Sequence, residues 1–394
     1  MEENPPYGRR VVATSFLRDL LIGRRTVSAP PAEYLDHTIE WLCRAQDATP
    51  DGGVARQFNL RRGWLPSYPE TTGYIIPTFF RYAELRGERN YGARAERMAA
   101  WLLGERLADG STYGGGVEAE VKSPAIFNTG MVQFGFLRAY ESTGDQEYLD
   151  AIREAALFLV ASQDPDGAWR RNLSRYATGK VHVYNTRTAW ALALSGQKLH
   201  EPGWIDAAVK NVEWALEQSN ENGWLRYNDL VSDASPLTHT IAYAFRGILE
   251  TAVIVGRQDW IDGVRRVAET LIERQDRDGS LAGCLDGNWN PTVRSVCLTG
   301  CAQIALIWLR LFEMTHEARF LQAAQIANRY VMSTQILDHS NPGIRGGVKG
   351  SQPIWGDYLD FCYPNWAAKF AADAVMLELR VAEPRSARTA VPFA

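Results

Sequence analysis

The sequence predicts an all-α protein built as a ring of paired helices. Amphipathic segments, which are apolar on one face, alternate with segments that are apolar nearly all round. A glutamine followed by an Asp-Gly turn recurs where the amphipathic segments end. Each helical pair can bury its apolar face only against neighbouring pairs, so a repeat of this kind specifies a stacked helical architecture.

The stretch from Ala151 to Leu194 contains the most complete copy of the repeating unit. It begins with apolar residues at helical spacing, which predict an amphipathic outer helix. Asp164-Pro165-Asp166-Gly167 ends this helix, because proline cannot continue it and glycine allows the chain to turn. A long loop then leads to Asn185-Thr186, which can cap an apolar inner helix.

Taken in order, the chain begins with an expected irregular arm over residues 1–31, in which 16–22 has the pattern of a short helix. Residues 32–382 are expected to form one helical domain, and 383–394 a tail. The amphipathic helices are predicted at 33–46, 91–107, 146–163, 203–218, 259–275 and 317–335, and the apolar ones at 71–86, 127–142, 185–198, 239–255, 295–314 and 365–381.

The spacing of the glutamines sets the repeat length. Gln163, Gln218, Gln275 and Gln335 follow one another at intervals of 55, 57 and 60 residues. The unpaired first and last helices complete one pair between them, which predicts a closed (α/α)6 toroid. An open α-solenoid is the alternative, but it needs polar capping helices, and neither 33–46 nor 365–381 has that composition.

Composition narrows the function classes. The 394 residues are 46% hydrophobic, include 13 Trp and 16 Tyr, and carry a net charge of −4, which does not favour binding to nucleic acid. The first residues lack the apolar run of a signal peptide, and the most apolar run, 296–309, is too short to cross a membrane. The five Cys are scattered and odd in number, which argues against a disulfide scaffold, so we expect a reduced, cytoplasmic protein. No CxxC pair is present, and we expect no metal or other cofactor.

The loops indicate which end of the ring is functional. Connections from apolar to amphipathic helices are short, whereas those leading into the apolar helices are long, and long loops in compact domains are usually functional. The same end collects the partial positive charge of the inner-helix N-termini, which favours anionic ligands. We therefore expect the pocket at this end of the ring.

Several residues near the inner-helix starts are candidates for proton transfer. His239 follows Thr238, which already supplies a cap, so the imidazole is available as acid, base or donor; a packed core histidine is the alternative. Glu70 is either a capping acid or a general acid or base. The catalytic candidates are His239, Glu70, Tyr184, Tyr363 and Asp357, with Tyr68 as a further possible base.

A second group is expected to bind the substrate. The binding candidates are Tyr68, Asn128, Asn185, Arg187, Arg294, Trp355, Asp360, Asn365 and Trp366. Among them the amides and Arg187 would neutralise a carboxylate, and the aromatic rings would stack on sugar faces. Helix capping, solvated surface charge and an aromatic lid over the core are the alternatives for the same residues.

The turn Gln163–Trp169, which recurs in degenerate form at 275–281, resembles the repeat of terpenoid cyclases and protein prenyltransferases. This likeness implies a toroid, but the chemistry does not carry over: the chain has no Asp-Asp dipeptide and hence neither cyclase aspartate motif. Asp360-Phe361-Cys362 matches a prenyltransferase zinc pair, yet no histidine follows to complete the site.

The helix starts SYPETTGYIIPT, FNTGMVQFGFLRAY, YNTRTAWAL, LTHTIAYAFRGILE and YPNWAAKFAADA resemble toroid proteins of bacterial capsule and exopolysaccharide biosynthesis. Their layout is also similar to that of uronate-acting (α/α)6 enzymes, namely glucuronyl C5-epimerases, alginate- and heparin-type lyases and unsaturated glucuronyl hydrolases. The resemblance implies a carbohydrate-active protein with an anionic poly- or oligosaccharide as its partner.

Three hypotheses follow from the sequence. In the first, the protein is an enzyme that acts on a uronate-containing glycan. It either removes the C5 proton, as a lyase or epimerase does, or hydrolyses the glycan. Hydrolysis would use Glu70 and either Asp357 or Asp360 as the carboxylate pair. In the second it is an isoprenoid enzyme of the cyclase or prenyltransferase type. In the third it is a non-catalytic glycan-binding subunit of polysaccharide assembly.

Overall fold

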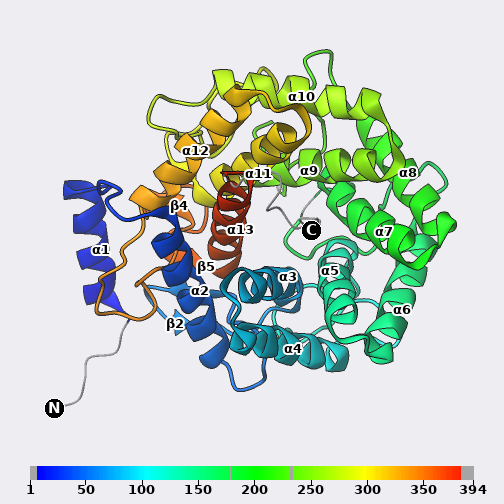
Figure 1. Cartoon of the computed structure of the whole chain (residues 1–394), viewed down its shortest axis with the longest axis horizontal. Helices are drawn as coiled ribbons and strands as arrows, with labels where there is room; N and C mark the ends of the chain where they lie inside the picture. Colours follow the sequence, from blue (N-terminus) through cyan, green and yellow to red (C-terminus); the bar gives the residue numbers. More distant parts are fainter. Residues whose placement is uncertain (1–6, 178, 231–233, 383–394) are drawn as a thin grey trace.

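The computed structural model describes residues 7–177, 179–230 and 234–382, so the predicted tail 383–394 lies outside the described residues. The described part is a ring of helices (Figure 1). Its α-helices are α1 (Arg9–Leu21), α2 (Pro31–Asp47), α3 (Pro69–Arg86), α4 (Arg89–Gly104), α5 (Ile126–Thr143), α6 (Gln146–Ser162), α7 (Thr186–Leu199), α8 (Pro202–Glu217), α9 (Thr238–Val255), α10 (Gln258–Glu273), α11 (Leu298–Thr315), α12 (Ala318–Ser333) and α13 (Asn365–Ala382).

The odd-numbered helices from α3 to α13 form the inner ring, and the even-numbered ones from α2 to α12 surround it (Figure 1). Each inner helix packs against the next, and α13 completes the circle by contacting both α11 and α3. The last inner helix also packs on α2, so the first and last helices of the ring form a pair as predicted. The structure therefore confirms the (α/α)6 toroid.

The recurring glutamine and glycine join neighbouring outer helices. At the end of α6, Gln163 Nε2 donates to the carbonyl of Gly167 in the turn, at 3.0 Å, and to that of Ala207 in α8, at 2.8 Å. Gly167 has φ of 90°, and a Cβ there would lie 2.3 Å from the carbonyl oxygen of Lys210 in α8. The turn thus requires glycine both for its conformation and for its close approach to the next unit.

Further copies of this junction extend round the ring. Gln275 Nε2 donates at 3.1 Å to the carbonyl of Ala323 in α12, and Gln46 makes the matching bond to α4. Gln335 closes the circle, because its Nε2 donates at 2.9 Å to Thr38 Oγ1 in α2. At Gln46, Gln163, Gln275 and Gln335 the repeated glutamine therefore connects neighbouring outer helices, whereas Gln218 bonds within its own helix.

Short strands join the long loops. The strands are β1 (Gln57–Asn59), β2 (Gly63–Trp64), β3 (Val296–Cys297), β4 (Ser351–Gln352) and β5 (Cys362–Pro364), and a 3-10 turn (Val183–Asn185) precedes α7. Antiparallel pairing gives one sheet of order β2-β1-β5 and another of β3-β4. The pairing of β1 with β5 joins the loop before α3 to the loop before α13, so the ring is closed on its loop side as well.

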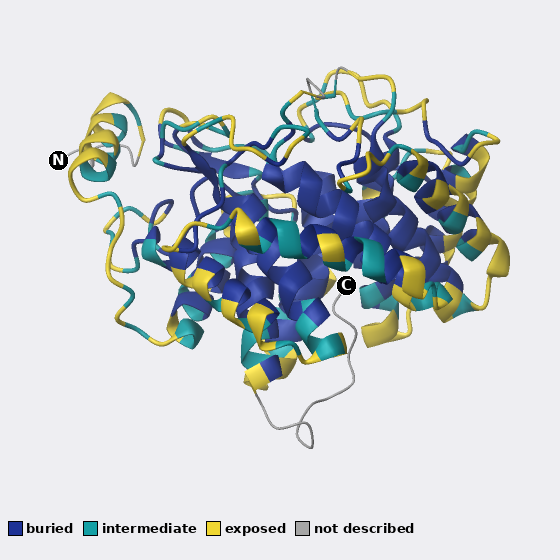
Figure 2. Ribbon diagram, turned by 90° about the horizontal axis from the view of Figure 1, so that it is seen from above, coloured by how far each residue is buried: buried dark blue, intermediate teal, exposed yellow. Residues whose placement is uncertain are grey.

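The short helix expected at 16–22 is present but begins earlier: α1 covers 9–21 beside the ring (Figure 1), so the expectation of an irregular chain is wrong for residues 9–15. A buried ion pair between Asp19 and Lys349, with 2.7 Å between the carboxylate and Nζ, attaches this helix to a long loop. The inner helices are buried nearly all round, and the long loops lie together on one side of the ring (Figure 2). No helix in the described ranges is long and apolar enough to span a membrane.

The glutamine junction can be tested by comparing Gln163→Ala with Gln218→Ala. Gln163 bridges two units, whereas Gln218 Nε2 donates at 3.0 Å to Trp214 in its own helix. Loss of these two side-chain hydrogen bonds, each worth about 0.5–1.5 kcal/mol, should cost Gln163→Ala about 1–3 kcal/mol of unfolding free energy. Gln218→Ala should stay within about 0.5 kcal/mol of the parent. Equal losses for the two variants in chemical denaturation would contradict the junction.

Candidate functional site in the loop-side cavity

A cavity of about 380 Å³ lies at the end of the ring where the inner helices begin. Small-molecule sites typically have volumes of about 300–1,000 Å³, so the cavity can hold a short oligosaccharide. Its lining residues are Arg56, Gln57, Tyr68, Glu70, Tyr74, Phe127, Ser174, Tyr176, Tyr184, Leu230, His239, Thr240, Tyr243, Tyr358, Leu359 and Trp366. Five of the residues proposed from the sequence are in this set: Tyr68, Glu70, Tyr184, His239 and Trp366.

Helical spacing explains how two inner helices supply paired groups. Glu70 and Tyr74 lie one turn apart on α3, and His239 and Tyr243 lie one turn apart on α9. Residues four apart share a helix face, so each pair points to the same side. The rings of His239 and Tyr243 have centroids 4.4 Å apart. Both helices thus present an ionisable group near the cavity mouth and a tyrosine one turn deeper.

Glu70 is buried, and Tyr68 Oη donates a hydrogen bond to its carboxylate at 2.6 Å. Burial raises the pKa of Glu70 to about 7, although the hydrogen bond from Tyr68 and the positive charge of Arg187 act in the opposite direction. A carboxyl group with this pKa exchanges protons readily near neutral pH. Among the described lining residues it is the only carboxylate.

His239 lines the cavity, and its ring contacts the buried side chain of Gln303. The side-chain amide of Gln303 lies 2.5 Å from Nδ1, which leaves Nε2 as the ring nitrogen available to a ligand. Burial, together with the positive charge of Arg187, lowers the pKa of His239 to about 3. The imidazole is therefore neutral near pH 7 and acts as a hydrogen-bonding group, because a base with so low a pKa removes protons poorly.

Tyrosines form much of the cavity wall. Burial raises the pKa of Tyr68, Tyr184 and Tyr243 above the usual phenol range. Their hydroxyls therefore stay protonated and donate hydrogen bonds, which does not favour Tyr68 or Tyr184 as the base. Phe127 adds an apolar face, with its ring centroid 5.0 Å from that of Tyr243. The wall thus combines ring faces with hydroxyl donors.

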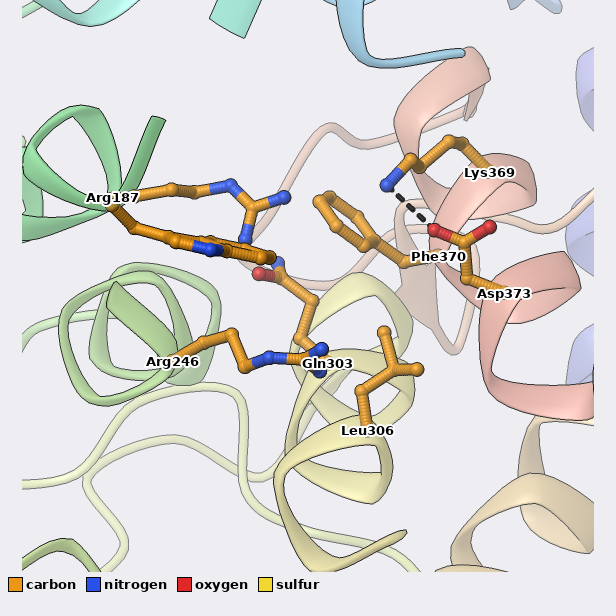
Figure 3. Close-up of a pocket in the computed structure, with 8 residues that line it drawn as sticks. Arg187, Arg246, Gln303, Leu306, Lys369, Phe370 and Asp373 are labelled. Carbon is orange, nitrogen blue, oxygen red and sulfur yellow. Dashed lines mark ion pairs between the residues drawn. The ribbon is translucent and has the colours of Figure 1, made fainter. Parts of the chain in front are cut away.

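Arg187 was expected to contact the substrate, but it does not line this cavity. Its guanidinium borders a separate small void deeper in the ring (Figure 3) and lies 5.1 Å from the ring centre of Tyr243, a residue of the cavity wall. Although Arg187 is the second residue of α7, it is buried below the wall rather than exposed at the mouth. Its influence on the cavity is electrostatic.

Buried ion pairs fill the ring below this level. Glu250 of α9 forms ion pairs with Arg246 at 2.7 Å and with Arg310 at 2.8 Å. Burial opposes ionisation of Glu250, but the two guanidiniums outweigh it and lower its pKa to about 2. On the opposite side, Asp373 pairs with Lys369 and Arg81. These pairs occupy the interior beneath the cavity.

The proposed carboxylate partners of Glu70 do not reach the cavity. Asp357 is exposed, and its carboxylate accepts a bond from Ser295 Oγ at 2.5 Å. Asp360 is also exposed and pairs with Arg61 at 3.0 Å. The β3-β4 pairing and the following turns direct both away from the lining, so the structure does not form the carboxylate pair suggested for hydrolysis.

Three other candidates also lie outside the cavity. Tyr363, in the middle of β5, is buried against the loop below α1, where it borders a different cavity with Lys349. Arg294 is exposed on its loop. Trp355 packs against Phe16 of α1, with ring centroids 4.5 Å apart. Trp355 therefore helps to hold the N-terminal helix.

The three asparagine candidates are buried and do not line the cavity. Asn365 Nδ2 donates to the carbonyl of Ala55 and to a threonine hydroxyl of α3, and thereby fixes the start of α13. Asn128 Nδ2 donates at 3.0 Å to the carbonyl of Tyr113 and lies 3.4 Å from Tyr68 Oη. Asn128 thus positions Tyr68, and Asn185 belongs to the turn before α7.

Sequence reasoning missed Tyr243, Tyr358 and Phe127 as parts of the wall. Tyr243 had a usable signal, because it lies four residues after His239. Tyr358 had none, since its position depends on the loop fold; its hydroxyl accepts a bond from Trp366 Nε1 at 2.9 Å. Among the described residues no three His, Cys, Asp or Glu side chains cluster as a metal site requires.

Comparison with known proteins places the chain in the structural class of (α/α)6 toroids. An unsaturated glucuronyl hydrolase specific for heparin superposes with a TM-score of 0.71 at 18% identity, covering 89% of this chain and 97% of the other. The unsaturated glucuronyl hydrolase of Bacillus sp. GL1 gives 0.70 at 14% identity, with 89% and 97% covered. Cellobiose 2-epimerase from Bacillus thermoamylovorans gives 0.70 at 13% identity, with 94% and 99% covered.

These likenesses show a shared fold over nearly the whole of each chain. No protein-family model matches the sequence, and no curated protein matches it. The activity must therefore be argued from the cavity itself.

The opposite environments of Glu70 and Glu250 predict opposite effects of removing their charges. Because the pKa of Glu70 rises from 4.5 to about 7 on folding, stability falls as pH rises through that interval. Glu70→Gln should therefore be more stable than the parent above neutral pH, by up to roughly 3 kcal/mol at about 1.4 kcal/mol per pKa unit.

The matched variant Glu250→Gln should behave in the other direction. In the parent, the pKa of Glu250 is lowered to about 2 on folding, so this carboxylate stabilises the protein at neutral pH and loses that effect as pH falls. Removing it breaks the buried ion pairs with Arg246 and Arg310, at a cost of about 3–5 kcal/mol, although Arg310 keeps its ion pair with Glu313 at 2.6 Å. Thermal melts across pH measure both variants, and a destabilised Glu70→Gln above neutral pH would refute the assignment.

Proposed function

We propose that the protein is a carbohydrate-active enzyme that binds a uronate-containing oligosaccharide in the loop-side cavity and exchanges a proton with it through Glu70. The observation that carries this proposal is a single buried carboxyl group with a pKa of about 7, hydrogen-bonded to Tyr68 in an aromatic cavity. The structural likeness to glucuronyl hydrolases and a sugar epimerase supports the same class of substrate.

The lining suits a sugar. Aromatic faces such as Phe127 and Trp366 cover the apolar faces of a pyranose ring, while tyrosine hydroxyls, His239 and Thr240 can bond to its hydroxyl groups. A purely apolar ligand would leave these polar groups without partners, which is unfavourable. The mixture therefore favours a hydroxyl-rich ligand over an isoprenoid.

An acidic sugar matches the electrostatics of the site. Arg56 lines the cavity, although it also pairs with Glu118 at 2.6 Å, and the buried charge of Arg187 lies behind the wall. The first turns of α3 and α9 contribute their N-terminal partial charges. Because the three asparagine candidates do not line the cavity, these groups and the tyrosine hydroxyls are the candidates to stabilise a substrate carboxylate.

The number of carboxylates in the cavity distinguishes proton abstraction from two-carboxylate hydrolysis. Lyase and C5-epimerase reactions begin with removal of one proton, which an ionised Glu70 can accept while neutral donors stabilise the enediolate-like charge. Two-carboxylate hydrolysis requires a second acid, and the cavity supplies only Glu70 among its described residues. Proton abstraction is therefore our first candidate, and hydrolysis, which the similarity to glucuronyl hydrolases favours, is the second.

Incubation with a panel of uronate oligosaccharides distinguishes these reactions. We expect either an unsaturated product with new ultraviolet absorbance, which identifies a lyase, or uptake of solvent deuterium at C5 without cleavage, which identifies an epimerase. New reducing ends without such absorbance would select hydrolysis instead. Binding of the oligosaccharide with no reaction would overturn the enzyme proposal and favour a glycan-binding subunit.

Substitutions test the role of Glu70 once a substrate is found. Glu70→Gln should reduce turnover by about 10²–10⁴-fold without loss of fold, since it removes the proton-transfer group. The parent should show a pH-rate limb with its midpoint near the Glu70 pKa of about 7. Asp360→Asn is the matched control, because this exposed carboxylate lies outside the cavity and should retain full activity.

A further inference from the structure

A second, much smaller void lies beneath the cavity wall, between α7, α9, α11 and α13. It measures about 10 Å³, which is room for one water-sized occupant. The residues around it are Arg187, Trp190, Arg246, Gln303, Leu306, Lys369, Phe370 and Asp373. Figure 3 shows the guanidinium of Arg187 and the amine of Lys369 extending toward the space between them. Three cations and one carboxylate therefore surround the void.

The carboxylates near the void are already engaged. Asp373 accepts Lys369 Nζ at 2.6 Å on one oxygen, and Arg81 at 3.2 Å and Thr78 at 2.8 Å on the other. Glu250 forms ion pairs with Arg246 of the same helix and with Arg310 of α11, as described above. Every oxygen of these two carboxylates is therefore already bound by at least one donor.

Arg187 is the cation without an acidic partner. Its side chain is 3% exposed, its Nε has no hydrogen-bond partner, and it forms no ion pair within the described residues. Four aromatic rings surround the guanidinium, with centroids 5.1–5.6 Å from its carbon: Phe134, Trp190, Tyr243 and Phe370. Cation–π contacts are weaker than an ion pair and do not replace the hydration lost on burial.

We propose that the void binds a single halide ion of the chloride class, held by Arg187 and facing Lys369. A monatomic anion matches the size of the space and supplies the negative charge that the surrounding carboxylates do not. A sugar carboxylate does not fit this role, because the void is much smaller than a sugar ring and is separate from the cavity that would hold the substrate.

The experiment uses bromide as the probe. Protein exchanged into a halide-free gluconate buffer is titrated with sodium bromide at constant ionic strength while Tm is followed. A ligand that binds only the folded state raises Tm in a saturable manner, and we expect a rise of a few degrees. Arg187→Met should abolish the rise and, without halide, be at least as stable as the parent because an unpaired buried charge is removed. Arg56→Met, which changes a cation outside the void, should keep the response.

Anomalous diffraction from bromide-grown crystals locates the ion independently. A peak between Arg187 and Lys369 in the parent protein supports the site by itself, so the test still works if Arg187→Met fails to fold. If that variant does fold, the peak should disappear from its crystals. A void that holds only water, or a Tm response that is unsaturable and equal in both proteins, overturns the proposal. Neither readout depends on catalysis, so the outcome is separate from that of the proposed function.

Discussion

The structure depends on closure of the ring. An amphipathic outer helix and an apolar inner helix cannot bury their surfaces alone, so every pair relies on its neighbours, and only a closed circle leaves no pair uncovered. Closure is secured at several levels: α13 packs against α2 and α3, Gln335 bonds to Thr38 across the same junction, and β5 pairs with β1. The remaining features of the molecule follow from this circle.

A ring of six inner helices encloses a space that must be filled or used. Whether a given level of this space is filled by side chains or left as a cavity depends on which residues lie at that depth along the inner helices. At the loop end the first turns carry Glu70 and His239, and the second turns carry Tyr74 and Tyr243; these residues line the cavity. Deeper turns carry ion pairs such as Glu250 with Arg310. The cavity consequently lies at the loop end of the ring, and the buried ion pairs lie deeper.

The sequence was sufficient to predict what local rules determine. The repeat and the helix starts predicted the toroid, and the inner-helix starts predicted Glu70 and His239, because helix position fixes where those side chains point. Asp357 and Tyr363 were placed wrongly, since loop direction there depends on strand pairing between distant segments. Arg187 was misjudged because only the packed structure shows how deeply its side chain is buried.

Joining the first and last helices also affects how the protein is made. During synthesis the chain emerges from its N-terminus, so α2 and α3 are complete long before α13, the helix that covers both. Until then the buried faces of α3 and α11 that meet α13 stay exposed, and exposed apolar surface on unfinished chains favours aggregation. An open solenoid can add units one at a time, whereas this ring remains incomplete until its last helix leaves the ribosome.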